Sequence, residues 1–449
     1  NERSGFSSRL GFVLATAGSA VGLGNIWRFP YLAAKYGGGT FLLTYLILTL
    51  TFGFSLMITE VALGRKAGTS AIRAFGHFSK KHTFIGYLTT IIPFIIFPYY
   101  CVIGGWVTKY ALVSLQGGIH NAASDTFFTG FISKSAEPMI CVLVFLIATT
   151  VVVAGGVKGG VERVSTIMMP VLIVLLIGVS LFCITRPGAM AGVAYYLKPS
   201  LKGFGPTTIL AALGQLFYSM SLAMGIMITF GSYMPKKADL EKSVTQVEIF
   251  DTGVAFLAGL MIVPAVFVFS NGDSSMLAKG PSLMFVMLPK VFDSMAFSSV
   301  IAAVFFILVL LAALTSSISL LETLVAVLMD KFHMKRGTAC ITMFIIALLL
   351  AVPSSLGFGA WSNITILGFD FLDFFDFISN SVLMPIAAFL TCLFVGYIIK
   401  PKVIVDEVES SGEFKRKSLF FIMVKYIAPI CIVAILVFSV LEGLGFITV

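Results

Sequence analysis

The stretch Gly18-Ser-Ala-Val-Gly-Leu-Gly-Asn25 interrupts the first long apolar segment of the chain, residues 8–34. Its glycines weaken a continuous helix, because each costs up to about 1 kcal/mol relative to alanine. Irregular backbone at membrane depth is tolerated only where it lines a cavity enclosed by protein. The stretch therefore predicts a broken helix beside such a cavity, although Gly18 and Gly22 also fit a small-residue motif for close helix packing.

The composition places this segment in a membrane. Of the 449 residues, 58% are hydrophobic and 11% are charged, whereas a soluble domain carries about 25% charged residues. Apolar runs long enough to cross a hydrocarbon core of about 30 Å recur along the chain. We predict an all-α membrane protein with about eleven transmembrane helices, at residues 8–34, 40–64, 84–116, 138–155, 164–185, 207–233, 243–270, 296–329, 338–353, 370–399 and 419–446.

Basic residues indicate the orientation of these spans. If the N-terminus is cytoplasmic, 20 of the 30 Lys and Arg lie in cytoplasmic segments and seven in the opposite segments. Cytoplasmic loops of membrane proteins carry such an excess. We therefore predict a cytoplasmic N-terminus and an external C-terminus, and we expect no nucleic-acid partner despite the net charge of +9. One outer segment, residues 271–295, is long enough for a helical hairpin that forms a lid, or for an unstructured loop.

A second polar interruption lies in the sixth span, at Gly214-Gln-Leu-Phe-Tyr-Ser-Met-Ser-Leu-Ala-Met-Gly225. Breaks in spans 1 and 6 indicate an inverted 5+5 repeat, in which discontinuous helices form a site near the bilayer midplane. Broken helices offer N–H groups to a carboxylate and C=O groups to Na⁺. We predict one transporter domain, residues 1–449, with repeats at about 8–185 and 207–399 and an extra C-terminal helix at about 419–446.

A hydroxyl cluster, Thr315-Ser316-Ser317, lies inside the eighth span. Ser and Thr within a helix usually bond back to the carbonyl four residues earlier. Hydroxyl and carbonyl oxygens are nevertheless the ligands that a small, hard cation prefers. Together with carbonyls of a broken helix, this cluster would form a dehydrated Na⁺ site.

The run Gly18-Ser-Ala-Val-Gly-Leu-Gly-Asn-Ile-Trp-Arg-Phe-Pro30, followed by Gly37–Gly39 and Glu60-(x)3-Gly64-Arg65, resembles the neurotransmitter:sodium symporter family. The bacterial amino-acid transporters of that family are the nearest match, and the resemblance covers essentially the whole chain. It implies a symporter in the bacterial plasma membrane that imports a neutral hydrophobic or aromatic L-amino acid with sodium by alternating access.

The resemblance also implies a set of site residues. The first of two sodium sites takes Ala20, Asn25, Ser219 and Asp251 together with the substrate carboxylate. The second takes carbonyls of Gly18, Val21 and Ala312 and hydroxyls of Thr315 and Ser316. The substrate contacts Ala20, Leu23, Gly24, Ile96, Tyr100, Tyr218, Ser219, Ser221, Ala223, Met224, Ser316 and Leu320.

Two pairs of charged residues match the gates of the family. Arg28 and Asp376 would form the outer gate, with Tyr218 closing over the substrate, and Arg3 and Asp330 the inner gate, with Ser232 and Tyr233 beside them. The alternative for each pair is an ordinary surface ion pair, worth about 0–1 kcal/mol. Glu60 matches a position that braces the broken sixth span, whereas Glu322 matches no role.

Asp251 departs from the family pattern, because the prototype and the chloride-dependent animal members carry Asn there. Its expected neighbours are Tyr45, Gln215, Ser219 and Ala255. An acid within a span is costly, so a functional role is expected. We predict that Asp251 supplies the negative charge that chloride supplies elsewhere, so transport needs no chloride, with proton export on the return step as a further hypothesis.

Gly22 favours an amino-acid substrate, because the monoamine carriers of the family place an aspartate at this position. No charged residue lines the inferred pocket, which argues against charged substrates. Leu, Trp, Tyr and Phe remain candidates, and a γ-amino acid remains open. The sequence shows neither the polar rings of a channel nor an acid/base or metal constellation of an enzyme, and it indicates no obligate protein partner.

Overall fold

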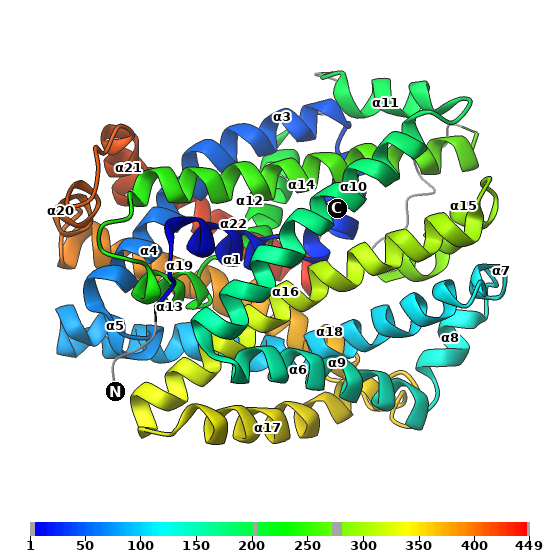
Figure 1. The fold of residues 1–449 in the computed structure, drawn as a ribbon. Helices are drawn as coiled ribbons and strands as arrows, with labels where there is room; N and C mark the ends of the chain where they lie inside the picture. The colour runs from blue at the N-terminus through cyan, green and yellow to red at the C-terminus, as the bar shows by residue number, and fades with distance from the viewer. Residues whose placement is uncertain (1–4, 201–203, 272–280, 447–449) are drawn as a thin grey trace.

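The computed structural model describes residues 5–200, 204–271 and 281–446 as a bundle of helices (Figure 1). By length and composition, nine helices in these ranges can cross a membrane. They are Gly39–Ala67 (α3, η2 and α4), Lys80–Leu115 (η3 and α6), Ala136–Ala154 (α9), Val157–Ile184 (η4 and α10), Leu240–Phe269 (α14), Ser298–Phe332 (α16), Arg336–Leu356 (α17), Phe371–Ile398 (α18, η7, α19 and η8) and Lys417–Gly443 (α21, η9 and α22).

Two further spans are interrupted, as the sequence predicts. The first consists of α1 (Arg9–Ala20) and a second half, Gly24–Lys35, which comprises η1 (Gly24–Arg28) and α2 (Phe29–Lys35); the two halves are bent by 56°. The sixth consists of α12 (Pro206–Ser219) and α13 (Ile226–Tyr233). The described residues thus provide nine continuous spans and one bent span, and a total of eleven requires that α12 and α13 count as one more.

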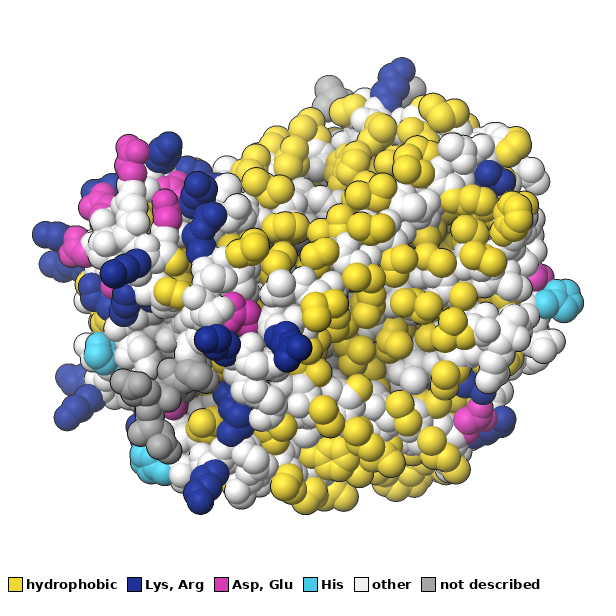
Figure 2. Space-filling model, viewed as in Figure 1, with side chains coloured by type: hydrophobic (Ala, Val, Ile, Leu, Met, Phe, Trp, Pro, Cys, Tyr) yellow, Lys and Arg dark blue, Asp and Glu magenta, His cyan; other side chains and the backbone are white. Residues whose placement is uncertain are grey.

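The outer surface of the bundle is apolar where lipid would contact it. On α9, the side chains of Ile140, Val144, Ile147 and Val151 are between 46% and 67% exposed. Their spacing of three and four residues places them on one helix face. Figure 2 shows a broad belt of hydrophobic side chains across the middle of the molecule, with Lys and Arg gathered at the end that holds α20. The belt is what a membrane-spanning bundle needs.

Short helices cover the two ends of the bundle (Figure 1). At the Lys- and Arg-rich end lie α5 (Ala71–Phe78) and α20 (Lys402–Glu409). At the other end lie α7 (Ile119–Ala122), α8 (Phe127–Ile132), α11 (Ala189–Leu197) and η6 with α15 (Leu283–Asp293). In the outer segment, residues 283–293 are therefore helical, and Leu283, Phe285 and Phe292 are buried.

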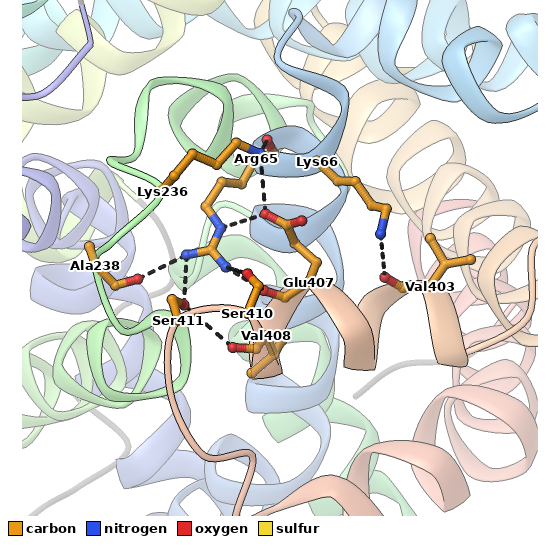
Figure 3. Close-up of polar contacts among 9 residues, drawn as sticks. All are labelled: Arg65, Lys66, Lys236, Ala238, Val403, Glu407, Val408, Ser410 and Ser411. Atoms are coloured by element: carbon orange, nitrogen blue, oxygen red, sulfur yellow. Dashed lines mark hydrogen bonds and ion pairs between the residues drawn. The ribbon is translucent and has the colours of Figure 1, made fainter.

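A buried ion pair joins three segments at the basic end (Figure 3). The Arg65 side chain, at the end of α4, is fully buried, and its Nε lies 2.8 Å from Glu407 Oε1 on α20. The same guanidinium donates to the carbonyl of Ala238 at 2.8 Å and to the hydroxyl of Ser411 at 3.0 Å. Arg65 therefore ties α4 to α20 and to the connection between α13 and α14.

Candidate functional site

The break in the first span leaves backbone groups free of the helical pattern. The helix α1 ends at Ala20, and Val21 adopts an extended conformation with φ −73° and ψ 103°. The side chain of Asn25 closes the break locally, because its Oδ1 accepts a hydrogen bond from the Gly22 N–H at 3.0 Å. Carbonyls before the break and N–H groups after it therefore lie at the centre of the bundle.

The break in the sixth span is a tight turn of residues 220–225. Ser221, Ala223 and Gly225 have positive φ angles of 52°, 62° and 73°, which are unusual for Ser221 and Ala223 because these two carry a side chain. The Ala223 N–H donates to Glu60 Oε1 at 2.7 Å. The bracing contact predicted for Glu60 is therefore confirmed, and it holds an otherwise strained turn in place.

The hydroxyl of Ser316 joins α16 to the first break. Its Oγ lies 3.1 Å from the carbonyl oxygen of Ser19, 3.2 Å from that of Val21 and 3.5 Å from that of Gly18. Thr315 Oγ1 donates to the carbonyl of Ala312 at 3.0 Å. A Cβ at Gly18 would lie 3.2 Å from the Thr315 side chain, so glycine permits this close approach. Of the oxygens predicted for the second sodium site, those of Gly18, Val21 and Ser316 thus lie together. The Thr315 hydroxyl bonds within its own helix, to the carbonyls of Leu311 and Ala312.

Asp251 on α14 contacts Asn25 and Ser219, two of the groups predicted for the first sodium site. Its Oδ1 accepts from Asn25 Nδ2 at 2.8 Å and from Ser219 Oγ at 2.9 Å, and its Oδ2 accepts from the Tyr45 hydroxyl at 3.3 Å. Asp251 is fully buried. Gln215, another of its expected neighbours, does not donate its Nε2–H to Asp251 but to the carbonyl of Gly24, at 3.0 Å.

Between these clusters lies a cavity of about 40 Å³. Eleven of the twelve residues predicted to contact substrate line it: Ala20, Leu23, Gly24, Ile96, Tyr100, Tyr218, Ser219, Ser221, Met224, Ser316 and Leu320. Ala223 is not among the lining residues, although its neighbours Ser221 and Met224 in the same turn are. Ser19, Gly22, Asn25 and Ile226 complete the lining.

One polar atom at the cavity lacks a protein partner. The hydroxyl of Tyr100 is buried and makes no hydrogen bond with the described residues. A buried, unsatisfied hydroxyl costs about 1–3 kcal/mol. Near this hydroxyl the backbone is packed so closely that only glycine fits at positions 22 and 24. A Cβ would lie 2.6 Å from Ser316 Oγ at Gly22 and 2.5 Å from the Tyr218 ring at Gly24. The cavity therefore offers a donor to a ligand that brings its own acceptor.

Comparison with known proteins decides the family. The model of the sodium:neurotransmitter symporter family matches residues 3–130 and 126–444 of the chain. The chain belongs to this family. A solved relative, MhsT in complex with L-phenylalanine, superposes with a TM-score of 0.87 at 38% identity, covering 97% of this chain and 100% of that one.

Bacterial relatives of the symporter extend over nearly its whole length. An uncharacterized sodium-dependent transporter of Bacillus subtilis, YhdH, is 35% identical over 96% of each chain. Another, from Haemophilus influenzae, is 34% identical over 97% of this chain and 98% of its own. The resemblance inferred from the Gly18–Pro30 run is therefore confirmed, and these relatives are transporters rather than enzymes.

The residues predicted for the outer gate of the symporter lie near its cavity but form no ion pair with each other in the structure. Within the described residues, Arg28 lies over the Tyr218 ring, 5.4 Å from its centre. Asp376 instead accepts hydrogen bonds from Tyr99 at 3.1 Å and Asn380 at 2.6 Å. In this conformation the expected contact of Arg28 is replaced by a cation–π contact with the ring of Tyr218.

At the inner gate, Arg3 lies outside the described residues. Asp330 Oδ2 accepts a hydrogen bond from the Ser70 N–H at 2.7 Å. The Tyr233 hydroxyl donates to Glu322 Oε1 at 2.8 Å, and both oxygens of Glu322 accept from Arg336, at 2.6 Å and 2.9 Å. Glu322, for which the sequence indicated no role, therefore anchors the end of α13 to the start of α17.

Ser19 and Ile226 are lining residues that the sequence prediction of site residues missed. The Ser19 carbonyl accepts hydrogen bonds from Ser221 at 3.0 Å and Ser316 at 3.1 Å, so it connects α1 to the break in the sixth span and to α16. The signal was present, because Ser19 is a polar residue inside the interrupted stretch. A backbone carbonyl's partners depend on tertiary packing, however, and no residue pattern encodes them.

Proposed function

We propose that this symporter imports a neutral hydrophobic or aromatic L-amino acid together with two sodium ions by alternating access. The proposal rests on residues that the cavity shares with two clusters of oxygen atoms, a first cluster around Asp251 and a second cluster around Ser316. Ser219 lines the cavity and bonds Asp251, and Ser316 lines the cavity and bonds the carbonyls of Ser19 and Val21. Occupancy of either cluster by Na⁺ would therefore act directly on the walls of the substrate site.

Coupling follows from which helices supply each cluster. The first cluster draws on the first span, α12 and α14, and the second draws on α1 and α16. A sodium ion that binds oxygens from separate helices binds best when those helices are close together. It therefore favours the arrangement in which the cavity is enclosed, and a ligand shifts an equilibrium only by such a difference in affinity.

The cavity favours a zwitterion with an uncharged side chain. The Tyr100 hydroxyl and the N–H groups that follow the break, those of Leu23 and Gly24, are donors suited to a carboxylate. The lining includes Ile96, Met224 and Leu320 and no charged residue. A charged substrate side chain would be buried there without a partner, which is costly. The phenylalanine bound to MhsT supports a hydrophobic amino acid.

Asp251 is proposed to replace chloride. It is a fully buried carboxylate that contacts Asn25 and Ser219, two groups of the first cluster, so its charge can offset that of a sodium ion. We expect uptake to stay constant when gluconate replaces chloride. Uptake that falls with chloride removal would refute this part of the proposal.

The substrate is tested by competition. Full-length protein is reconstituted into proteoliposomes, and sodium-dependent uptake of labelled phenylalanine is measured in the presence of each unlabelled amino acid, neutral or charged. Unlabelled Leu, Trp, Tyr or Phe should compete, whereas Glu and Lys should not. Competition by charged amino acids but not by hydrophobic ones would contradict the proposed pocket chemistry.

The proposed orientation places the end that holds α20 in the cytoplasm of a bacterial cell. It rests on the Lys and Arg gathered at that end (Figure 2) and on the positive-inside rule. A cysteine introduced at the exposed Lys335 should react with a membrane-impermeant maleimide only after the cells are opened. Labelling of intact cells at that position alone would reverse the orientation.

A further inference from the structure

A groove lies between the last two spans at the basic end, away from the transport cavity. It runs between η8 (Phe394–Ile398) with the start of α20 and the segment formed by α21 (Lys417–Ile422) and η9 (Met423–Ile427). Its volume is about 360 Å³. The lining consists of Gly396, Tyr397, Lys400, Pro401, Lys402, Phe421 and Lys425.

Three lysines in this lining have no acidic partner among the described residues. The ion pairs that these elements do make involve other cations: Glu409 pairs with Lys417, and Glu407 pairs with Arg65. Lys425 lies inside the apolar span Lys417–Gly443, where a charged side chain is rare and indicates a function. Its ammonium is 5.9 Å and 5.4 Å from the ring centres of Tyr397 and Tyr426.

Two of these lysines have a constrained backbone. The Tyr397 hydroxyl donates to the carbonyl of Lys425 at 2.6 Å, which fixes the two walls relative to each other. Lys400 has a φ of +68°, a left-handed conformation that residues with a side chain rarely adopt. Such conformations are found where the surrounding structure imposes them, often at binding sites.

Apolar side chains continue from the groove along the lipid-facing surface. Ile398, Ile422 and Tyr426 are 43%, 51% and 55% exposed. They belong to the same helical segments as the groove lining. A ligand with an anionic head and hydrocarbon chains would therefore meet lysines at one end and apolar surface at the other.

We propose that this groove binds the headgroup of an anionic glycerophospholipid, with the phosphate between Lys400, Lys402 and Lys425 and the acyl chains against the adjoining apolar side chains. Basic pockets between helices on the cytoplasmic side of membrane proteins bind such headgroups. The leaflet concerned depends on the proposed orientation. A free phosphate ion shares the headgroup chemistry, but it would leave the apolar wall without a role.

The test measures binding of dioleoyl-phosphatidylglycerol to the detergent-solubilised full chain by native mass spectrometry. A lysine near the membrane surface contributes about fivefold in affinity, so replacing the three should cost roughly 100-fold. The variant is Lys400→Gln, Lys402→Gln, Lys425→Gln. The matched control, Lys80→Gln, Lys81→Gln, Lys335→Gln, removes the same charge from exposed lysines of the same end, and it should bind as the unmodified protein does.

Three results would overturn the proposal: equal losses in the two triple variants, equal binding of dioleoyl-phosphatidylcholine, or displacement of the lipid by millimolar inorganic phosphate, which would assign the site to a soluble anion. The single variant Lys402→Gln changes only an exposed side chain and should lose about fivefold, which keeps the test decisive if the triple variant does not fold. The readout needs neither transport nor a known orientation, so it stands apart from tests of the proposed function.

Discussion

A methyl group added at Gly24 would lie 2.5 Å and 2.6 Å from Cδ1 and Cε1 of the Tyr218 ring. Carbon atoms in contact normally lie about 3.5–4.0 Å apart. In Gly24→Ala the ring must therefore withdraw by about 1 Å from the break in the first span. Because this ring forms part of the cavity wall and lies beneath Arg28, its withdrawal widens the cavity at that wall.

The magnitude follows from the overlap. Forcing an extra methyl group into a packed contact costs about 1–3 kcal/mol. The cost falls on the conformation in which the Tyr218 ring lies against the first break. It should therefore appear as a loss of substrate affinity of about 5- to 150-fold. Affinity is measured as sodium-dependent binding of labelled phenylalanine to the purified protein, and stability is measured by the melting of the substrate-free protein.

Gly214→Ala is the matched control, because Gly214 lies on α12, the helix of Tyr218, and a Cβ there has only the Arg28 guanidinium, at 4.0 Å, within contact distance. It should leave affinity unchanged. If Gly24→Ala binds substrate as tightly as the control does, the Tyr218 ring does not need its position against the break, and the reasoning fails.

Three further substitutions test other contacts. Tyr100→Phe should weaken substrate binding by about 10- to 150-fold, since a hydrogen bond to a charged group contributes about 1.5–3 kcal/mol. The melting temperature of the substrate-free protein should not fall. A lower melting temperature with unchanged substrate affinity would show that the hydroxyl has a structural role instead. Ser316→Ala should raise the sodium concentration for half-maximal uptake severalfold, because it removes an oxygen beside the carbonyls of the first break, and an unchanged sodium titration would exclude it from the ion site. Glu407→Gln should destabilise the protein by roughly 3 kcal/mol, because it leaves the buried guanidinium of Arg65 uncompensated; a change below about 1 kcal/mol in chemical unfolding would show that the carbonyl contacts suffice.

The long apolar spans are predictable from the sequence because hydrophobicity and length alone define them. The predicted spans 40–64 and 243–270 correspond to Gly39–Ala67 and Leu240–Phe269. Short amphipathic helices such as α5 and α20 lie outside the predicted spans, because eight residues do not reach the length that a membrane span requires. Glycines and polar residues inside apolar runs did locate both breaks.

The candidate site is predictable in its residues but not in its bonds. Asn25, Ser219 and Asp251 were expected together, and the structure joins them within 3.0 Å. Arg28 and Asp376 lie 348 positions apart in sequence, and whether they meet depends on the conformation of the bundle rather than on either residue. The contact of Arg65 with α20 likewise needs the folded chain, because its partners come from separate segments.

Uptake of labelled phenylalanine into proteoliposomes, with and without an inward sodium gradient, measures whether amino-acid transport is coupled to sodium. The two oxygen clusters that share Ser219 and Ser316 with the cavity predict accumulation above equilibrium only with the gradient, and its loss when an ionophore collapses the gradient. Uptake that proceeds equally without the gradient would contradict sodium coupling.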